Sequence, residues 1–225
     1  SEIPLKEVVN TRQWKFNLEI YRTDTTAGAG KARDIAIDLA DGEIIAFIDA
    51  DIIIQSSFIS NHVTAHLNTP VPALFVSFRE NIPDAGAASA YRKPDPRNGD
   101  HRIEMTFKEE WVMTDADKQL VGKKFNILKN TNGFKSLGNG NVHEQWTLPM
   151  MFLTCAASAP AKSVKIAHPT PEDLRGWGFN DTCLAAKMIA DGLFLIPLNN
   201  SNVYHILEEK HTRSNDKKNR EFLLN

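Results

Sequence analysis

The stretch that decides the fold is Glu43-Ile44-Ile45-Ala46-Phe47-Ile48-Asp49-Ala50-Asp51, a near-continuous apolar run that ends in two carboxylates. The run is too short for a helix and rich in β-branched residues, so it predicts a strand buried on both faces, as in a parallel sheet. Asp49 and Asp51 are two residues apart and project to the same face. Ligands bind at this end of the strands in open α/β sheets, so the pair predicts a site for a hard divalent cation and a phosphate. The competing interpretation is a turn whose Asp side chains cap the next helix.

The segments around this run alternate between helix and strand patterns. Upstream, apolar residues recur at i, i+3 and i+4 from Lys31, which predicts a helix that ends at Asp41-Gly42. Downstream, Ser56 or Ser57 can cap a second helix whose apolar positions face the core. The other expected elements are a helix from residue 181 to 190 and strands at 18–21, 73–78, 104–107, 150–155, 193–196 and 203–206. This alternation predicts an α/β fold.

Composition narrows the class of protein. The 225 residues are 42% hydrophobic and 24% charged, an ordinary balance for one globular domain. Lys and Arg number 26 against 28 for Asp and Glu, a net charge of −2 that disfavours nucleic acid as a partner. No apolar run approaches the ~20 residues of a transmembrane segment. Cys155 and Cys183 are too isolated for a disulfide framework, so we expect a cytoplasmic protein with both as small buried hydrophobes.

Three motifs carry a resemblance to GT-A glycosyltransferases, especially those of family 2. Residues 28–51 resemble their donor-binding segment, in which a Gly and a nearby Arg open a helix that leads into a hydrophobic strand ending in Asp-x-Asp. Arg175-Gly176-Trp177-Gly178-Phe179-Asn180-Asp181 looks like the Gly-Trp-Gly segment and acidic pair beside the acceptor. Val203-Tyr204-His205 stands where several GT-A enzymes carry a metal-binding His.

The resemblance implies a GT-A fold, with a mixed, mostly parallel sheet flanked by helices. It also implies a metal-dependent, inverting glycosyltransferase that moves a sugar from a nucleotide donor, with a UDP-sugar expected, to the hydroxyl of a glycan or other acceptor. The site residues implied are Gly30, Arg33, Asp49 and Asp51 for the donor, Asp51, His205 and Asp49 for Mn²⁺ or Mg²⁺, Trp177 and Asn180 for the acceptor, and Asp181 as the catalytic base.

The sequence departs from the family pattern at two places, and each departure changes what we expect of the domain or of its acceptor. Residues 1–22 resemble neither of the strands with which family 2 chains begin, so we expect one GT-A-like domain over residues 1–225 that is incomplete at its N-terminus. Asn180 replaces the first carboxylate of the usual acidic pair, so acceptor choice should differ. These departures also fit an alternative, a non-catalytic GT-A-like module that binds a nucleotide or glycan. A nucleotidyltransferase is a third possibility, disfavoured because its Gly-rich N-terminal loop is missing.

Some of these residues have competing structural interpretations. Arg33 can pair on the surface with Asp34 or Asp38 instead of binding a diphosphate. Asp181 can cap its helix instead of acting as a base. His62 and His66 share one helix face, where satisfied core-facing or surface histidines are favoured over a metal pair.

Overall fold

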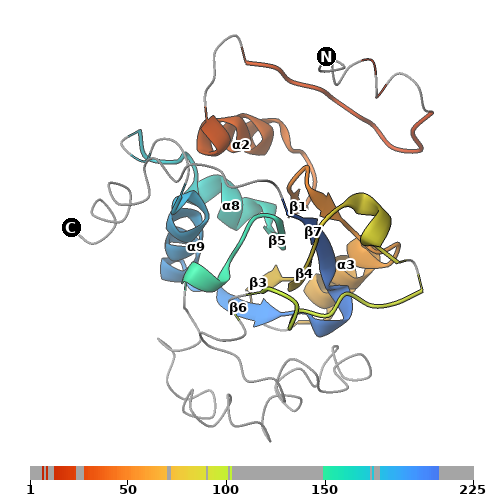
Figure 1. Cartoon of the computed structure of the whole chain (residues 1–225). Helices are drawn as coiled ribbons and strands as arrows, with labels where there is room; N and C mark the ends of the chain where they lie inside the picture. The colour runs from red at the N-terminus through yellow and green to blue at the C-terminus, as the bar shows by residue number, and fades with distance from the viewer. Residues whose placement is uncertain are drawn as a thin grey trace, which may run out of the picture.

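The structure is a computed structural model that describes residues 7, 9, 13–23, 28–69, 72–89, 91–100, 102, 149–172, 174 and 178–207. Within these residues a four-stranded sheet has the order β1-β5-β3-β6, and a three-stranded sheet has the order β2-β7-β4 (Figure 1). The strands are β1 (Ile44–Ile48), β2 (Ile52–Ile53), β3 (Ala73–Val76), β4 (Arg79–Ile82), β5 (Ala156–Pro160), β6 (Phe194–Pro197) and β7 (Val203–Ile206). The helices are α2 (Gly28–Leu39), α3 (Phe58–Asn68), α8 (Ala161–Ala167) and α9 (Asn180–Ala190), with short 3-10 turns η1 (Ala85–Ala87), η5 (Pro149–Met151) and η6 (Asn199–Ser201).

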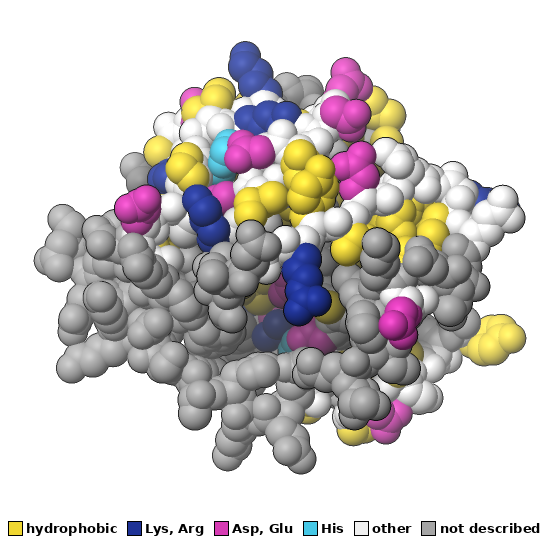
Figure 2. Space-filling view, turned by 90° about the horizontal axis from the view of Figure 1, so that it is seen from above, with side chains coloured by type: hydrophobic (Ala, Val, Ile, Leu, Met, Phe, Trp, Pro, Cys, Tyr) yellow, Lys and Arg dark blue, Asp and Glu magenta, His cyan; other side chains and the backbone are white. Residues whose placement is uncertain are grey.

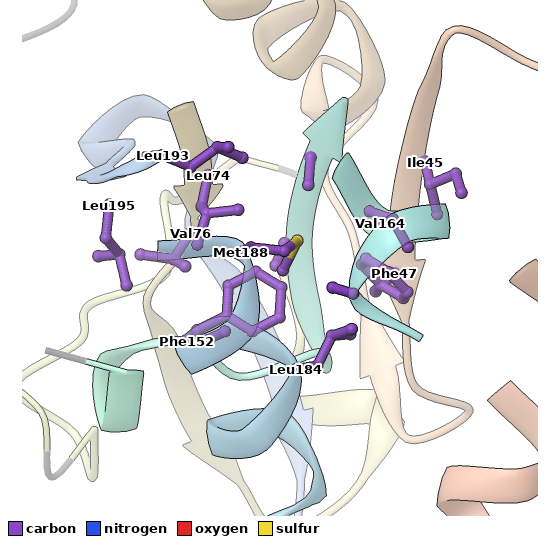
Figure 3. Close-up of a cluster of buried hydrophobic side chains, with 14 of the residues drawn as sticks. Ile45, Phe47, Leu74, Val76, Phe152, Val164, Leu184, Met188, Leu193 and Leu195 are labelled. Carbon is purple, nitrogen blue, oxygen red and sulfur yellow. The ribbon is translucent and has the colours of Figure 1, made fainter. Parts of the chain in front are cut away.

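Helices cover both faces of the larger sheet. Helices α2, α8 and α9 pack on one face and α3 on the other (Figure 1). Successive residues of the inner strand β3 face opposite sides of the sheet. Leu74 and Val76 join the core under α8 and α9, while Phe75 joins the core under α3. Figure 3 shows the larger core, where Phe47 and Phe152 meet edge to face with ring centroids 6.1 Å apart. The α/β class with a mixed sheet is therefore confirmed.

Several predicted elements are confirmed closely. The helix expected upstream of the apolar run is α2, which begins at Gly28 and is followed by Ala40 and the expected Asp41-Gly42. Helix α9 ends before Gly192, whose φ of 95° lies in the left-handed region that favours glycine. Strand β7 has the predicted bounds, 203–206. Cys155 and Cys183 are both buried, and burial raises the pKa of each thiol.

The prediction of a strand buried on both faces is wrong for β1. Ile45 and Phe47 are buried, but Ala46 and Ile48 are exposed. The reason is that β1 lies at the end of the sheet order, while the helix on that face, α3, packs against the inner strand β3. Among the described strands β1 pairs with β5 alone, and the pair is antiparallel.

The expected excess of parallel pairings is also absent from the described strands. Of the five pairings, three are antiparallel (β1 with β5, β2 with β7, β3 with β5) and two are parallel (β3 with β6, β4 with β7). The cause is β5, which lies between β1 and β3 and runs opposite to both.

Two predicted strands and one helix face are corrected. Residues 18–21 form no regular element and pair with no strand in the described part of the chain, and Leu18 and Ile20 are exposed. Residues 150–155 form the end of η5 and a loop, and the strand begins only at Ala156. On α3, Ile59, Val63 and Leu67 are exposed instead of buried, because the helix presents Phe58, His62 and Ala65 to the sheet. The strand expected at 104–107 lies outside the described residues. No helix in the described ranges is both long and apolar enough to cross a bilayer.

Candidate functional site

The candidate site gathers side chains from segments far apart in the sequence. Asp49 and Asp51 directly follow β1, Arg33 lies on α2, Asp181 lies in the first turn of α9, and His205 lies on β7. Seen from above (Figure 2), the surface is hollowed near its centre, and basic, acidic and histidine side chains lie together in the hollow. The predicted acceptor residue Trp177 lies outside the described residues.

Arg33 and Asp181 bind each other, and Thr154 joins them. Arg33 Nη1 lies 3.1 Å from Asp181 Oδ1, and Nη2 donates a 2.6 Å hydrogen bond to Thr154 Oγ1. The hydroxyl of Thr154 donates to Asp181 Oδ1 at 2.9 Å, and the backbone N–H of Thr154 donates to Oδ2 at 3.2 Å. The Arg33 and Asp181 side chains keep 16% and 27% of their surface exposed, so a ligand in solvent can reach both.

The competing interpretations of these two residues are wrong. Asp34 is buried and accepts hydrogen bonds from Thr170, while Asp38 pairs with His168, so neither binds Arg33. The residue that caps α9 is Phe179, with a φ of 61°, and no side-chain cap bond is made at this helix start in the described structure. Asp181 is therefore free of a capping role and turns its carboxylate to Thr154 and Arg33.

Asp51 and His205 form the second half of the site. His205 Nε2 lies 3.3 Å from Asp51 Oδ2, and His205 Nδ1 lies 3.0 Å from Asn81 Oδ1. A carbonyl oxygen only accepts, so Nδ1 carries the proton of this hydrogen bond. Asp51 Oδ1 is buried, and no described group hydrogen-bonds to it. A cation held between Asp51 and His205 would satisfy this oxygen.

The donor set of this half fits a divalent metal. One carboxylate with an unsatisfied oxygen and one imidazole oriented by an amide are ligands that Mn²⁺ accepts, and substrate oxygens can complete the shell. Asp49 does not join them as a third ligand, because the described residues contain no group of three or more His, Cys, Asp or Glu side chains placed to hold a metal ion.

Asp49 sits in a concentration of negative charge. Desolvation by the surrounding protein raises the pKa of Asp49 above its ordinary value, and the charge of Asp181 adds to the rise. Arg33 and Arg79 oppose it, while Asp51 reinforces it. Asp49 thus lies within electrostatic reach of two other carboxylates and two guanidinium groups, an arrangement that favours the arrival of a cation together with an anionic ligand.

Three residues of the site were not predicted from the sequence. Thr154 lies in the loop before β5, and its role depends on a contact with residue 181 that no local pattern shows. Arg79 and Asn81 alternate along β4, and that alternation of polar residues was an available signal. Arg79 Nε is buried without a hydrogen-bond partner in the part of the chain that the structure describes.

Gly30 and Asn180 lie together under the site. Asn180 is 7% exposed, and its Oδ1 would lie 3.0 Å from a Cβ added to Gly30, with Thr170 Cγ2 at 3.1 Å. The glycine therefore lets α2 approach α9 closely. Its predicted contact with the donor, and the contact of Asn180 with the acceptor, stay predictions.

Comparisons with known proteins relate this arrangement to others. The sequence model of glycosyl transferase family 2 matches residues 3–129, more than half of the chain. The structure is similar to S. aureus TarS 1–349 and to S. aureus TarS 1–349 in complex with UDP-GlcNAc, with TM-scores of 0.55 and 0.56 at 17% identity in both cases. These matches cover 92% and 94% of this chain but 48% of each TarS chain, so the chain spans about half the length of the structures it matches. Among curated proteins no relative matches the sequence.

Proposed function

The chain belongs to glycosyl transferase family 2, and we propose that it transfers a sugar from a UDP-sugar to an acceptor hydroxyl, with inversion and with Mn²⁺ or Mg²⁺ bound. The observation that carries the proposal is the position of Asp181, a partly exposed carboxylate held by Thr154 beside a cluster of cationic and acidic groups. UDP is the expected nucleotide because a protein of similar fold binds UDP-GlcNAc.

The donor's diphosphate needs positive charge, and the site can supply it from two sides. Arg33 and Arg79 are the guanidinium groups within electrostatic reach of Asp49. On the other side Asp51 and His205 would hold the metal ion, with Asp49 toward the ribose or in the outer shell. When bound, the ion would neutralise charge on the diphosphate and on the departing nucleotide.

Asp181 is the proposed general base. An alcohol is a poor nucleophile at neutral pH, so a carboxylate within hydrogen-bond reach of the acceptor speeds its attack. The acceptor oxygen forms a bond to the anomeric carbon, and the bond from that carbon to the diphosphate oxygen breaks. The electron pair of the broken bond leaves with UDP, and the acceptor proton passes to Asp181. A single displacement of this kind inverts the anomeric configuration.

A turnover assay distinguishes this proposal from the non-catalytic alternative. UDP release from a panel of UDP-sugars, beginning with UDP-GlcNAc, is measured with Mn²⁺ or with chelator, with and without a panel of hydroxyl-bearing acceptors. We expect metal-dependent release that increases with one class of acceptor. Binding of UDP-sugar without turnover under every condition would favour the binding module. Failure to bind any nucleotide sugar would contradict both.

A further inference from the structure

In the proposed mechanism Arg33 binds the diphosphate of the donor, but the structure shows it bound to Asp181. We infer that Arg33 exchanges partners when the donor binds, leaving Asp181 for the diphosphate, so that the base becomes available only in the donor-loaded site. This inference rests on the proposed function. It adds an order of events and assigns Thr154 as the positioning residue that keeps Asp181 in place.

The contacts between Arg33, Thr154 and Asp181 occupy the proposed base, so Arg33 has to leave before an acceptor binds there. Asp181 Oδ1 lies 3.1 Å from Arg33 Nη1 and accepts a hydrogen bond from the Thr154 hydroxyl at 2.9 Å, so this oxygen already faces a guanidinium and a hydrogen-bond donor. The other oxygen, Oδ2, accepts from the Thr154 backbone N–H at 3.2 Å. Both oxygens of the carboxylate are therefore engaged in the structure. An acceptor hydroxyl meets a freer carboxylate oxygen after Arg33 has left.

The contacts of Arg33 with Asp181 leave room for a diphosphate to compete with Asp181 for the guanidinium. Arg33 Nη1 lies 3.1 Å from the carboxylate, while its second nitrogen, Nη2, donates its hydrogen bond to Thr154 Oγ1. This is not the two-pronged pairing that makes Arg–carboxylate bridges strong. A diphosphate carries more charge than a carboxylate and offers oxygens for both prongs of the guanidinium, so it is the stronger partner.

Thr154 retains Asp181 after the exchange. Both of its bonds to the carboxylate, from the hydroxyl and from the backbone N–H, are independent of Arg33. The carboxylate therefore stays fixed while its charge partner leaves. Thr154 also accepts from Arg33, so it marks the resting position to which the guanidinium returns after UDP departs.

The exchange makes an unusual prediction that a double-mutant cycle tests. If UDP must displace Asp181 from Arg33, then Asp181→Asn should tighten UDP binding, by about fivefold for a partly exposed ion pair, as measured by calorimetry with saturating Mn²⁺. In the Arg33→Gln background the same change should have no effect, because no pair remains to break. Uridine, which has no phosphate, should bind all four proteins equally.

A charge control separates exchange from simple repulsion. Asp38→Asn removes the same charge from an exposed position on the same helix as Arg33 and should leave UDP affinity unchanged. If Asp181→Asn tightens UDP equally with and without Arg33, the effect is charge repulsion and the exchange is contradicted. An unchanged UDP affinity in Asp181→Asn contradicts it as well. Absence of UDP binding by the wild-type protein would instead overturn the proposed function.

The positioning role of Thr154 is tested by measuring kcat and UDP affinity separately in variants of this residue. Thr154→Val loses the hydroxyl but keeps the backbone N–H and the shape of the side chain, so kcat should fall about tenfold while UDP affinity is retained. Thr154→Ser restores the hydroxyl and should recover most of kcat. Equal activity of Val and Ser variants would show that Thr154 serves packing alone.

Discussion

At the scale of single residues, Asp51 Oδ1 is an unsatisfied atom of the site, buried with no hydrogen-bond partner among the described groups. A metal ion at Asp51 and His205 would satisfy it. We expect Asp51→Ala to abolish the dependence of UDP binding on Mn²⁺, measured by titrating UDP with and without the metal. Metal-dependent binding of undiminished strength in this variant would place the ion elsewhere.

Asn81 offers a milder test of the same site. Its Oδ1 accepts from His205 Nδ1 and fixes the ring orientation. Loss of such an outer partner typically lowers metal affinity about 10- to 100-fold, so Asn81→Ala should weaken Mn²⁺ by that order without removing a ligand. A Mn²⁺ titration monitored by electron paramagnetic resonance gives the value. An unchanged affinity would mean that the ring needs no support from Asn81.

Arg79 has a buried side-chain nitrogen to which a ligand could bind. Its Nε has no partner in the described structure, whereas Arg33, Arg92, Arg97 and Arg102 each bind a carboxylate. We expect Arg79→Gln to weaken UDP about tenfold or more while uridine binding is kept, as measured by calorimetry. The control is Arg97→Gln, a half-exposed arginine paired with Asp95. Equal losses for UDP and uridine would argue against a phosphate contact.

At the scale of elements, the approach of α2 to α9 depends on Gly30. A Cβ there would meet Asn180 Oδ1 at 3.0 Å and Thr170 Cγ2 at 3.1 Å, so in Gly30→Ala these two side chains must give way by a few tenths of an ångström. We expect about 1 kcal/mol lower unfolding free energy. Gly42→Ala is the matched control, since its nearest neighbour would lie at 3.5 Å, an ordinary contact. Denaturant unfolding that finds both variants equally stable would contradict this close packing.

The contact between α3 and the sheet should make stability depend on pH. His62 bonds to Ser158 and Ser77, and His66 bonds to Ser158, which confirms the core-facing interpretation of both. Burial lowers the pKa of His62 to about 3 and that of His66 to about 4, and the neighbouring His66 also lowers that of His62.

The direction of the pH effect follows from these values. Both rings are neutral in the folded protein but bind protons in the unfolded chain below about pH 6.5, so the folded state loses stability as pH falls from there toward 4 and then 3. We expect the urea-unfolding free energy to fall with a slope approaching about 1.4 kcal/mol per pH unit for each proton. His66→Gln should reduce the slope. An identical slope in that variant would assign the effect to other groups.

The elements also show what the sequence could predict. Strand β7 and helices α3 and α9 were found within a residue or two because their apolar periodicity and end signals are local. The two-sided burial of β1 was wrong because residue type does not show whether a strand lies inside a sheet or at its end. The Asp51–His205 pairing followed from a resemblance, whereas the bonds of Thr154 to Asp181 join residues that only tertiary packing brings together.

At the scale of the whole molecule, the site unites residues from position 33 to position 205, taken from the three-stranded sheet, from the loops beside β1 and β5, and from helices α2 and α9. A ligand that binds across these segments stabilises the entire described fold. We expect UDP with Mn²⁺ at about 100 times its dissociation constant to add about 2.7 kcal/mol, seen as a rise in Tm. A rise of the same size in Asp51→Ala would show that the metal side of the site does not contribute.

The measurement that tests the central claim most directly is the rate of sugar transfer by Asp181→Asn compared with that of the wild-type protein, with product stereochemistry followed by NMR. Asparagine keeps the size of the side chain and can still accept from the Thr154 backbone, but it cannot take the acceptor proton. We therefore expect UDP to bind the variant about fivefold more tightly, transfer to fall by ~10²-fold or more, and the wild-type product to have an inverted anomeric centre. Wild-type rates in the variant, or a product that retains the donor's configuration, would contradict the assignment of Asp181 as the base.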